Sequence, residues 1–418
     1  MKKILLISGG VILVVVLGIF SWILVSKDPE VPVGEVLRDF LPFGSGDDFV
    51  VPPGGGGFGE GEGGEDSSVG EGGAPEKILF RVTDVPVAGF VTLNRGASST
   101  AVRYAERATG HIYEVNLENL ERARLTNQTL PKIYEAHFRA DGSAVLFRSL
   151  QNDSDVITNV SLAIAPPKAA ATSSEDEFYT VSSTALRGEL GSVAAGPTNT
   201  LFYVLDDVDS IVSSAFDGSS QKTLLSSQFT DWVLAPYGNT GLLVYTKAGG
   251  ANTPGYAYTL GGSGGLTKVA GPVPDLTALI SHDGKKLVLS QSYAGNIRSF
   301  IRNVEDDTSS EMSSPTFADK CVWSRERLAV VFCATPSNNI GSGEPSNWYL
   351  GRTSFQDKIW SFDTETELSE LLAEPANIVG LDLDLVRPKL SPREDYLVFI
   401  NKKDLSLWAL KLAPAPEE

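Results

Sequence analysis

Residues 133–150 show a hydrophobic pattern that recurs through most of the chain. An apolar run, IYEAHF, is followed by the turn residues Asp141 and Gly142 and then by a second run, AVLFRSL. Two apolar runs separated by Asp-Gly are typical of a β-hairpin, because glycine readily takes the positive φ that a tight turn needs. The second run is rich in Val, Leu and Phe, and we expect it to be buried on both faces.

The apolar second strand of this hairpin has seven copies, at intervals of 43, 56, 42, 45, 43 and 67 residues. The copies end at Tyr104, Phe147, Tyr203, Tyr245, Ser290, Cys333 and Ile400. Four of the six intervals match the 40 to 45 residues of a four-stranded propeller blade. The two long intervals contain the insertions 165–177 and 337–357. The sequence therefore predicts an all-β fold, a seven-bladed β-propeller with four-stranded blades.

The last unit ends after its third strand, whereas one surplus strand, KILFRVT at 77–83, precedes the first unit. A ring of strands keeps an exposed edge unless its two ends meet. We therefore expect 77–83 to pair beside 405–410, so that the N-terminal strand closes the last blade. The propeller then spans 77–412, and 413–418 form a disordered tail.

Several of these phrases resemble repeats of known propeller families. WD40-like and TolB-like β-propeller repeats are similar to GHIYEVNLENLERARLT and FRADGSAVLFRS. A group of uncharacterised membrane-anchored propeller proteins of candidate-phylum bacteria resembles this chain in RYAERATGHIYE, KCVWS, NWYLGRTSFQD and INKKDLSLWAL. The resemblance covers about residues 77–412. It implies the fold and no particular activity, since propellers host enzymes, lectins and scaffolds alike.

Residues 1–26 predict a cytoplasmic stub and a membrane anchor. Lys2 and Lys3 precede 22 uncharged residues, Ile4 to Val25, which as a helix would reach roughly 33 Å and cross the apolar core of a bilayer. The positive-inside rule places the N-terminus in the cytoplasm and the propeller outside, in a single-pass protein of the cell membrane. The alternative is a signal peptide cleaved near Ser26, although the apolar run is long for one and no A-x-A-like site follows it.

Residues 27–76 predict a flexible tether. Gly, Glu, Asp and Ser dominate 44–76, and such a composition cannot bury enough apolar surface to offset the entropy of ordering. The chain has a formal net charge of -18, and 39–76 contribute nine acidic residues and no Lys or Arg. The remainder is mildly acidic, which argues against a nucleic-acid partner, because phosphate contacts need clustered Lys and Arg.

Cys321 and Cys333, the only cysteines, fall in the first and second strands of the sixth unit. If the turn between them is centred on Arg327, the two residues are directly opposite and close enough for a disulfide. An extracytoplasmic location permits this oxidation. The alternative is a pair of buried thiols that fill core space.

The insertion 337–357 contains candidate partner-binding residues of the types enriched at interface hot spots. These are Trp348, Tyr349, Arg352 and Phe355, to which the equivalent loop of the first unit adds Glu106 and Arg107. The insertion joins a second strand to a third, on the face that also carries the connections between blades. In the alternative, Trp348 and Tyr349 fold back to fill the central channel or cover a neighbouring blade.

The sequence predicts no catalytic set and no cofactor. His111, His137 and His282 occupy strand or turn positions, and Ser263 in GGSGG lacks the strand-to-helix turn of a nucleophile elbow. Asp382 and Asp384 alternate in LDLDL and are weak candidates for a Ca²⁺ site on one face of a strand, with solvated acidic loops as the alternative.

We therefore expect a binding or scaffolding module for an envelope protein, a peptide or a glycan. One alternative is an extracytoplasmic glycan hydrolase or lyase with carboxylates at the propeller mouth. Another is a purely structural spacer with a flat mouth.

Overall fold

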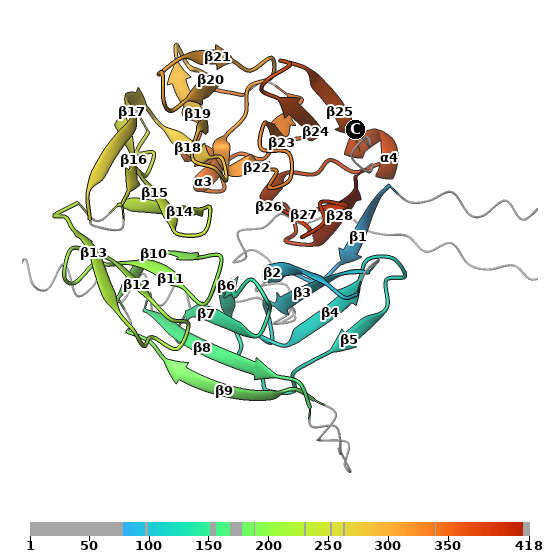
Figure 1. Cartoon of the computed structure of the whole chain (residues 1–418). Helices are drawn as coiled ribbons and strands as arrows, with labels where there is room; N and C mark the ends of the chain where they lie inside the picture. The colour runs from blue at the N-terminus through green and yellow to red at the C-terminus, as the bar shows by residue number, and fades with distance from the viewer. Residues whose placement is uncertain are drawn as a thin grey trace, which may run out of the picture. The chain divides into compact units, whose positions relative to one another are not determined.

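Seven four-stranded antiparallel sheets are arranged as the blades of a ring (Figure 1). The structure, a computed structural model, describes residues 78–96, 99–150, 156–167, 178–187, 189–229, 231–250, 253–261, 264–338 and 340–412. All of them belong to the second of two units of the chain, Gly73–Glu418. The predicted all-β propeller with seven four-stranded blades is confirmed.

In blades 1 to 6 the strands follow one another along the chain from the innermost to the outermost position (Figure 1). Blades 1 to 3 consist of β2(Val87–Asn94), β3(Thr100–Glu106), β4(Ile112–Asn116) and β5(Arg122–Arg124); β6(Ile133–Phe138), β7(Ala144–Leu150), β8(Ile157–Ala165) and β9(Thr180–Ala185); and β10(Leu190–Ala195), β11(Leu201–Leu205), β12(Ser210–Ser214) and β13(Lys222–Ser226). Blades 4 and 5 consist of β14(Trp232–Tyr237), β15(Gly241–Thr246), β16(Pro254–Leu260) and β17(Leu266–Pro274), and of β18(Thr277–Ile280), β19(Lys286–Tyr293), β20(Asn296–Asn303) and β21(Ser309–Glu311). Blade 6 consists of β22(Cys321–Trp323), β23(Val330–Pro336), β24(Asp357–Asp363) and β25(Ser369–Ala373).

Blade 7 joins the two ends of the propeller. It contains β26(Leu385–Leu390), β27(Tyr396–Asn401) and β28(Leu407–Lys411), and its outermost strand is β1(Leu79–Thr83) from the start of the described chain. Leu79 lies opposite Leu410 in an antiparallel pairing. The predicted closure of the ring by the N-terminal strand is confirmed.

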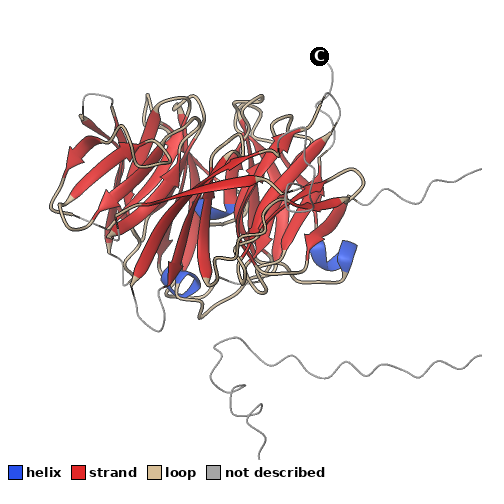
Figure 2. Ribbon diagram, turned by 90° about the horizontal axis from the view of Figure 1, so that it is seen from below, coloured by secondary structure: helices blue, strands red, loops and turns tan. Residues whose placement is uncertain are grey.

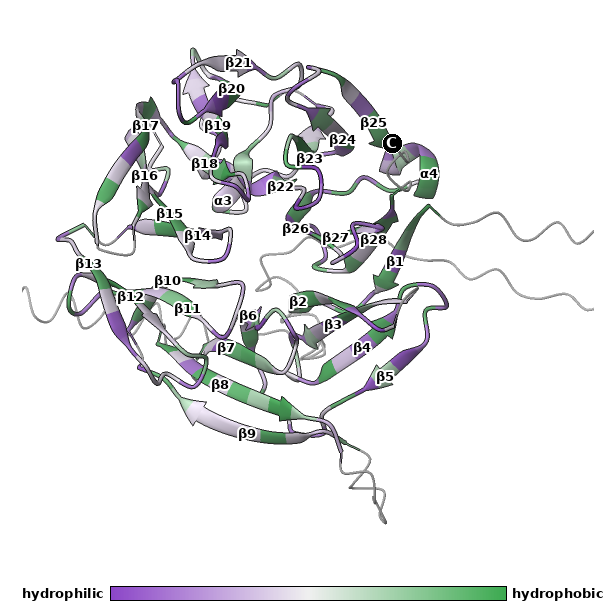
Figure 3. Cartoon of the chain, viewed as in Figure 1, coloured by the Kyte–Doolittle hydropathy of each residue, from purple (hydrophilic) through white to green (hydrophobic). Residues whose placement is uncertain are grey.

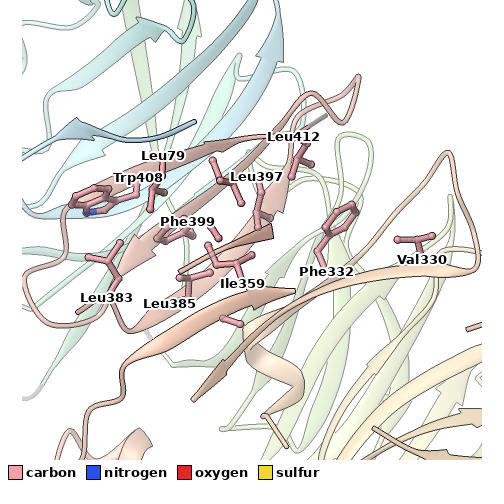
Figure 4. Close-up of a cluster of buried hydrophobic side chains, with 13 residues drawn as sticks. Leu79, Val330, Phe332, Ile359, Leu383, Leu385, Leu397, Phe399, Trp408 and Leu412 are labelled. Atoms are coloured by element: carbon pink, nitrogen blue, oxygen red, sulfur yellow. The ribbon is translucent and has the colours of Figure 1, made fainter. Parts of the chain in front are cut away.

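The core lies between neighbouring blades. Figure 4 shows one such layer, in which Leu79, Phe399 and Trp408 of blade 7 belong to the same cluster as Phe332 and Ile359 of blade 6. The second strands are mostly apolar and buried, as in β27, where all six residues are buried. The outermost strand β5 is exposed throughout and hydrophilic in Figure 3. Burial therefore decreases from the second strand of a blade to its outermost strand. This agrees with the expectation that the apolar second strand of each hairpin is buried.

The strands cross the thickness of the ring, so that loops gather on two faces (Figure 2). We call the face with the turns between first and second strands the hairpin face. The crossover face has the connections between blades and the turns between second and third strands. The helices among residues 78–412, apart from the gaps given above, are short: η1(Ala318–Lys320), α3(Ser346–Tyr349) and α4(Pro375–Val379).

In the part of the chain that the structure describes, no helix has the length and apolar character needed to cross a membrane. The predicted anchor, Ile4 to Val25, the tether 27–76 and the tail 413–418 lie outside the described residues, as does Ser263.

Candidate functional site

A cavity lies at each end of the channel that the innermost strands enclose. The hairpin-side cavity, about 470 Å³, takes residues from all seven innermost strands or the turns after them. Its lining is Val91, Thr92, Phe138, Ala140, Ala195, Gly196, Pro197, Pro236, Tyr237, Gly238, Asn239, His282, Val322, Trp323, Arg325, Lys389, Leu390 and Pro392. The crossover-side cavity, about 370 Å³, is lined by Val87, Ala88, Arg107, Tyr134, Asp319, Trp348, Tyr349, Val386, Arg387, Ile400, Lys402 and Leu405.

Two aromatic side chains anchor the 337–357 segment to the ring. Trp348 of α3 and Phe355 are each 3% exposed and pack around Phe317. The indole Nε1 of Trp348 donates to the carboxylate of Asp384 at 3.1 Å. Of the two alternatives for Trp348 and Tyr349, the structure shows the folded-back one for Trp348, and Phe355 is buried beside it, whereas Tyr349 is exposed. Trp348 still lines the crossover-side cavity, whereas Phe355 lines neither cavity.

The crossover-side cavity brings together two other predicted residues, Tyr349 and Arg107. Tyr349 is 38% exposed, and its hydroxyl donates to Asp319 at 2.6 Å. Arg107 stands on the turn between β3 and β4, where burial and then the charge of Arg387 lower its pKa. A phenol and a guanidinium from blades 6 and 1 thus face one cavity.

The remaining two predicted residues lie elsewhere. The Glu106 carboxylate accepts a hydrogen bond from the Thr109 hydroxyl within its own turn. Arg352 is exposed on the segment after α3. Neither residue is among the described residues that line the two channel cavities, so the predicted set is divided rather than assembled into one site.

A buried lysine that the sequence analysis missed fixes the same segment from inside. Lys320 Nζ is fully buried and lies 2.6 Å from one carboxylate oxygen each of Asp357 and Asp384. Asp384 also accepts hydrogen bonds from the Ser354 hydroxyl and the Phe355 amide. Burial opposes its ionisation, but Lys320 and these donors outweigh burial and hold the pKa of Asp384 below its usual value.

Asp357 differs from Asp384 in its hydrogen bonding. Its Oδ2 accepts from Lys320 and from the Leu385 amide, whereas its buried Oδ1 has no partner among the described residues. Burial therefore raises the pKa of Asp357. The ion group connects η1, β24 and the segment before β26, and it acts as a structural clamp beneath Trp348.

The prediction that Asp382 and Asp384 share one face of a strand is wrong. Both precede β26, which begins at Leu385; Asp382 is exposed and Asp384 is fully buried. The Asp384 carboxylate is already paired with Lys320. Among the described residues, no group of three or more His, Cys, Asp or Glu is placed to hold a metal ion.

Cys321 and Cys333 form a disulfide between β22 and β23. The two residues are directly opposite in the strand register, with Cα atoms 4.1 Å apart, as the predicted hairpin required. Both are buried in the core between blades 5 and 6. The pair is therefore a structural crosslink inside the ring and lies outside both cavities.

A second charged cluster, also missed from the sequence, lies on the inner strand β6. Glu135 is 2.9 Å from Arg148 and 2.9 Å from Arg387, and His137 lies 3.3 Å away. Burial raises the pKa of Glu135, but the hydrogen bond from His137 and the two arginine charges hold it well below its usual range. Arg387 comes from β26, 252 residues away in the chain, so no local sequence signal marks this contact.

Only one carboxylate, Asp319, occurs among the described residues that line the two cavities. Burial raises the pKa of this group. Acid–base hydrolysis of a glycan needs two carboxylates about 5 to 10 Å apart. The described lining brings no such pair together at either mouth.

The topology defines the class of protein as a seven-bladed β-propeller. No family model and no curated protein matches the chain. Among solved structures 826 chains are similar to it. One is the beta-propeller domain of Cps50 (Swd1) from Myceliophteria thermophila, which is 10% identical, with 80% of this chain and 100% of that chain covered and a TM-score of 0.49.

Proposed function

We propose that this chain is a membrane-anchored extracytoplasmic β-propeller that binds a protein, peptide or glycan at the cell envelope. The propeller supports a binding or scaffolding role, because its blades form a rigid ring that presents loops on two faces. The uncharged run from Ile4 to Val25 after Lys2 and Lys3 supports the anchor. A disulfide is typical of proteins outside the cytoplasm, and Cys321 with Cys333 fits that location.

The crossover-side cavity is the observation that carries the binding proposal. It is concave, and Arg107 and Tyr349 belong to the residue types that dominate protein interfaces. Leu350, next to Tyr349, is 64% exposed although it is apolar. The buried clamp of Lys320, Asp357 and Asp384 holds this segment in place, so that the cavity rim is pre-organised for a partner.

Screening the full-length chain against a glycan array and a peptide library tests this role. We expect a ligand whose affinity falls by about fivefold or more in Arg107→Ala and in Tyr349→Ala, a hot-spot effect above about 1 kcal/mol. Leu368→Ala is the matched control, because Leu368 is 70% exposed on the hairpin-face turn between β24 and β25. If Leu368→Ala lowers the affinity for the ligand as much as the two cavity variants do, the binding surface lies elsewhere.

The location is tested separately by adding a protease to intact cells that make the protein. We expect the propeller to fractionate with membranes and to be digested from outside. Release of a propeller whose N-terminus begins near residue 27 would favour the cleaved signal peptide instead, and protection in intact cells would contradict the extracytoplasmic location.

A further inference from the structure

Positive charge is concentrated in the channel of a strongly acidic protein. The chain has a net charge of -18, of which the nine acidic residues of 39–76 contribute half, and the remainder is still mildly acidic. The charged residues that line the two cavities are nevertheless five cations and one carboxylate. The cations are Arg107, Arg325, Arg387, Lys389 and Lys402. The composition alone would suggest the opposite balance of charge in the channel.

The inner strand β26 supplies two of these cations at alternating positions. Arg387 takes a positive φ of 53°, next to an irregularity in the pairing of β26 with β27. Arg387 is neutralised by Glu135 at 2.9 Å. Lys389, two residues further along, is exposed to the channel and lines the hairpin-side cavity.

Lys389 and Arg325 lack such neutralisation. Among the described residues, neither has a carboxylate within ion-pair distance. The ammonium of Lys389 donates to the carbonyl of Phe90 at 2.8 Å, which is a neutral acceptor, and lies 5.1 Å from the centre of the Phe90 ring. Glu135 cannot serve them, because Arg148 and Arg387 already share its two oxygens.

The surrounding protein disfavours the positive charge of Lys389. The position of the amine inside the ring, away from bulk water, and then the charges of Arg387 and Arg325, lower the pKa of Lys389 to about 8. Two cations that face one cavity without a counter-charge would each be stabilised by an anion placed between them. Charge-assisted hydrogen bonds from ammonium and guanidinium groups to oxyanions are among the stronger polar contacts in proteins.

We propose that the hairpin-side cavity binds a small molecule carrying two or more oxyanionic groups, carboxylate or phosphate, with Lys389 and Arg325 as its cationic ligands. The cavity volume of about 470 Å³ lies in the range of small-molecule sites. His282 and Tyr237 line the same cavity and add polar edges to it. This site is on the opposite mouth from Tyr349, so the inference goes beyond the proposed partner surface.

Titration calorimetry on the full-length chain at pH 7 tests the proposal with two probes, citrate for carboxylate and pyrophosphate for phosphate. Sodium chloride at matched ionic strength is the reference for non-specific screening. We expect saturable binding of at least one probe, and the stronger of the two identifies the oxyanion chemistry. No binding of either probe above the chloride reference overturns the proposal.

Variants then assign the site. Lys389→Met and Arg325→Gln should each lower the affinity for the probe by about 10- to 100-fold, the loss expected for one charge-assisted hydrogen bond. Lys268→Met is the control, because it removes the same charge from an exposed position on the outermost strand β17. Equal weakening by the control overturns the proposed site.

A measurement on the unaltered protein covers the case in which a variant does not fold. The bound probe should slow acylation of Lys389 by a small amine-reactive reagent, read by peptide mass spectrometry, while leaving Lys268 unaffected. Unchanged acylation of Lys389 at a saturating probe concentration overturns the proposal.

Discussion

At the scale of single residues, the lowered pKa of Lys389 makes the free energy of unfolding depend on pH. Its pKa in the folded chain is about 8, against an ordinary value of 10.5. Below pH 8 the amine is protonated in the folded and the unfolded chain alike, and the folded state carries the whole cost of the extra charge. Between about pH 8 and 10.5 the unfolded chain binds more protons, so this residue makes the free energy of unfolding rise with pH.

Replacing Lys389 by Met should therefore stabilise the protein at pH 7, and the gain should shrink as the pH rises from 8 to 10.5. Urea unfolding of the variant and the parent chain at several pH values measures this difference. Lys268→Met should show no such trend, because its amine stands exposed on β17. A Lys389→Met effect that is the same at pH 7 and pH 10.5 would contradict the depressed pKa.

The buried clamp around Lys320 gives a prediction of the opposite sign. Lys320→Met removes the cation and leaves two carboxylates in a site with no access to water, which costs about 3 to 5 kcal/mol of the free energy of unfolding. Lys358→Met is the control, because Lys358 pairs with Glu374 at 2.7 Å with about a third of each side chain exposed. We expect that surface change to cost less than about 1 kcal/mol.

Urea unfolding at pH 7 compares the two variants. If Lys320→Met lowers the free energy of unfolding as little as the surface variant does, the buried ion group is not the clamp we describe.

Residues such as Lys320 could not be predicted from the sequence for a physical reason. Its partners Asp357 and Asp384 stand 37 and 64 residues away, and only the packing of blades 6 and 7 brings them together. The sequence shows Trp348 as an aromatic residue of an insertion but leaves open whether it packs or binds, because Phe317, the ring against which it packs, gives no local signal.

At the scale of elements, the short hairpin of β22 and β23 depends on its crosslink. Strand β22 has only three residues, and the disulfide closes a loop with a sequence separation of 12. Closing a loop of this length lowers the conformational entropy of the unfolded chain, which stabilises the folded state by about 2 to 3 kcal/mol. Cys321→Ala with Cys333→Ala should lose about this much of the free energy of unfolding.

Chemical unfolding with and without a reducing agent measures the effect. The parent chain should lose stability when reduced under unfolding conditions, whereas the double variant should not respond to the reductant. A parent chain that is equally stable in both conditions would show that the crosslink contributes little.

Strands were predictable where alternation and turn residues coincide. Asp141 and Gly142 mark the turn of the β6–β7 hairpin, and Gly142 takes the expected positive φ of 73°. The same reasoning failed for LDLDL, since alternation alone does not show whether a neighbouring strand is present. Leu383 is buried between Asp382 and Asp384, but pairing begins only at Leu385.

At the scale of the whole molecule, the surplus strand at the start of the repeats and the missing strand at their end are enough to predict the closure of the ring. The number of blades followed from the spacing of a buried strand, which is a repeated signal. The charge of the channel did not follow from composition, because net charge says nothing about which side chains face inward. Arg387 and Lys389 become a pair of inner cations only through the position of β26 in the ring.

Removing β1 should open the ring. A chain without residues 1–83 loses Leu79 and Phe80 from two core clusters and leaves β28 as an unpaired edge. We expect a lower melting temperature and self-association through the exposed edge, as measured by thermal unfolding and size-exclusion chromatography. A chain without residues 1–77, which keeps β1, is the matched control. It should self-associate less than the chain without residues 1–83.

The closure has a mechanical consequence. Six blades are each one continuous stretch of chain, but the seventh is completed by a strand that no hairpin connects to its neighbour. Leu79 lies opposite Leu410, so a force that pulls residue 78 away from residue 412 acts on the end of this pairing. It would peel β1 from β28 one hydrogen bond at a time, whereas a force along the strands would load all of those bonds together. Under tension the ring therefore has a defined place at which it yields first.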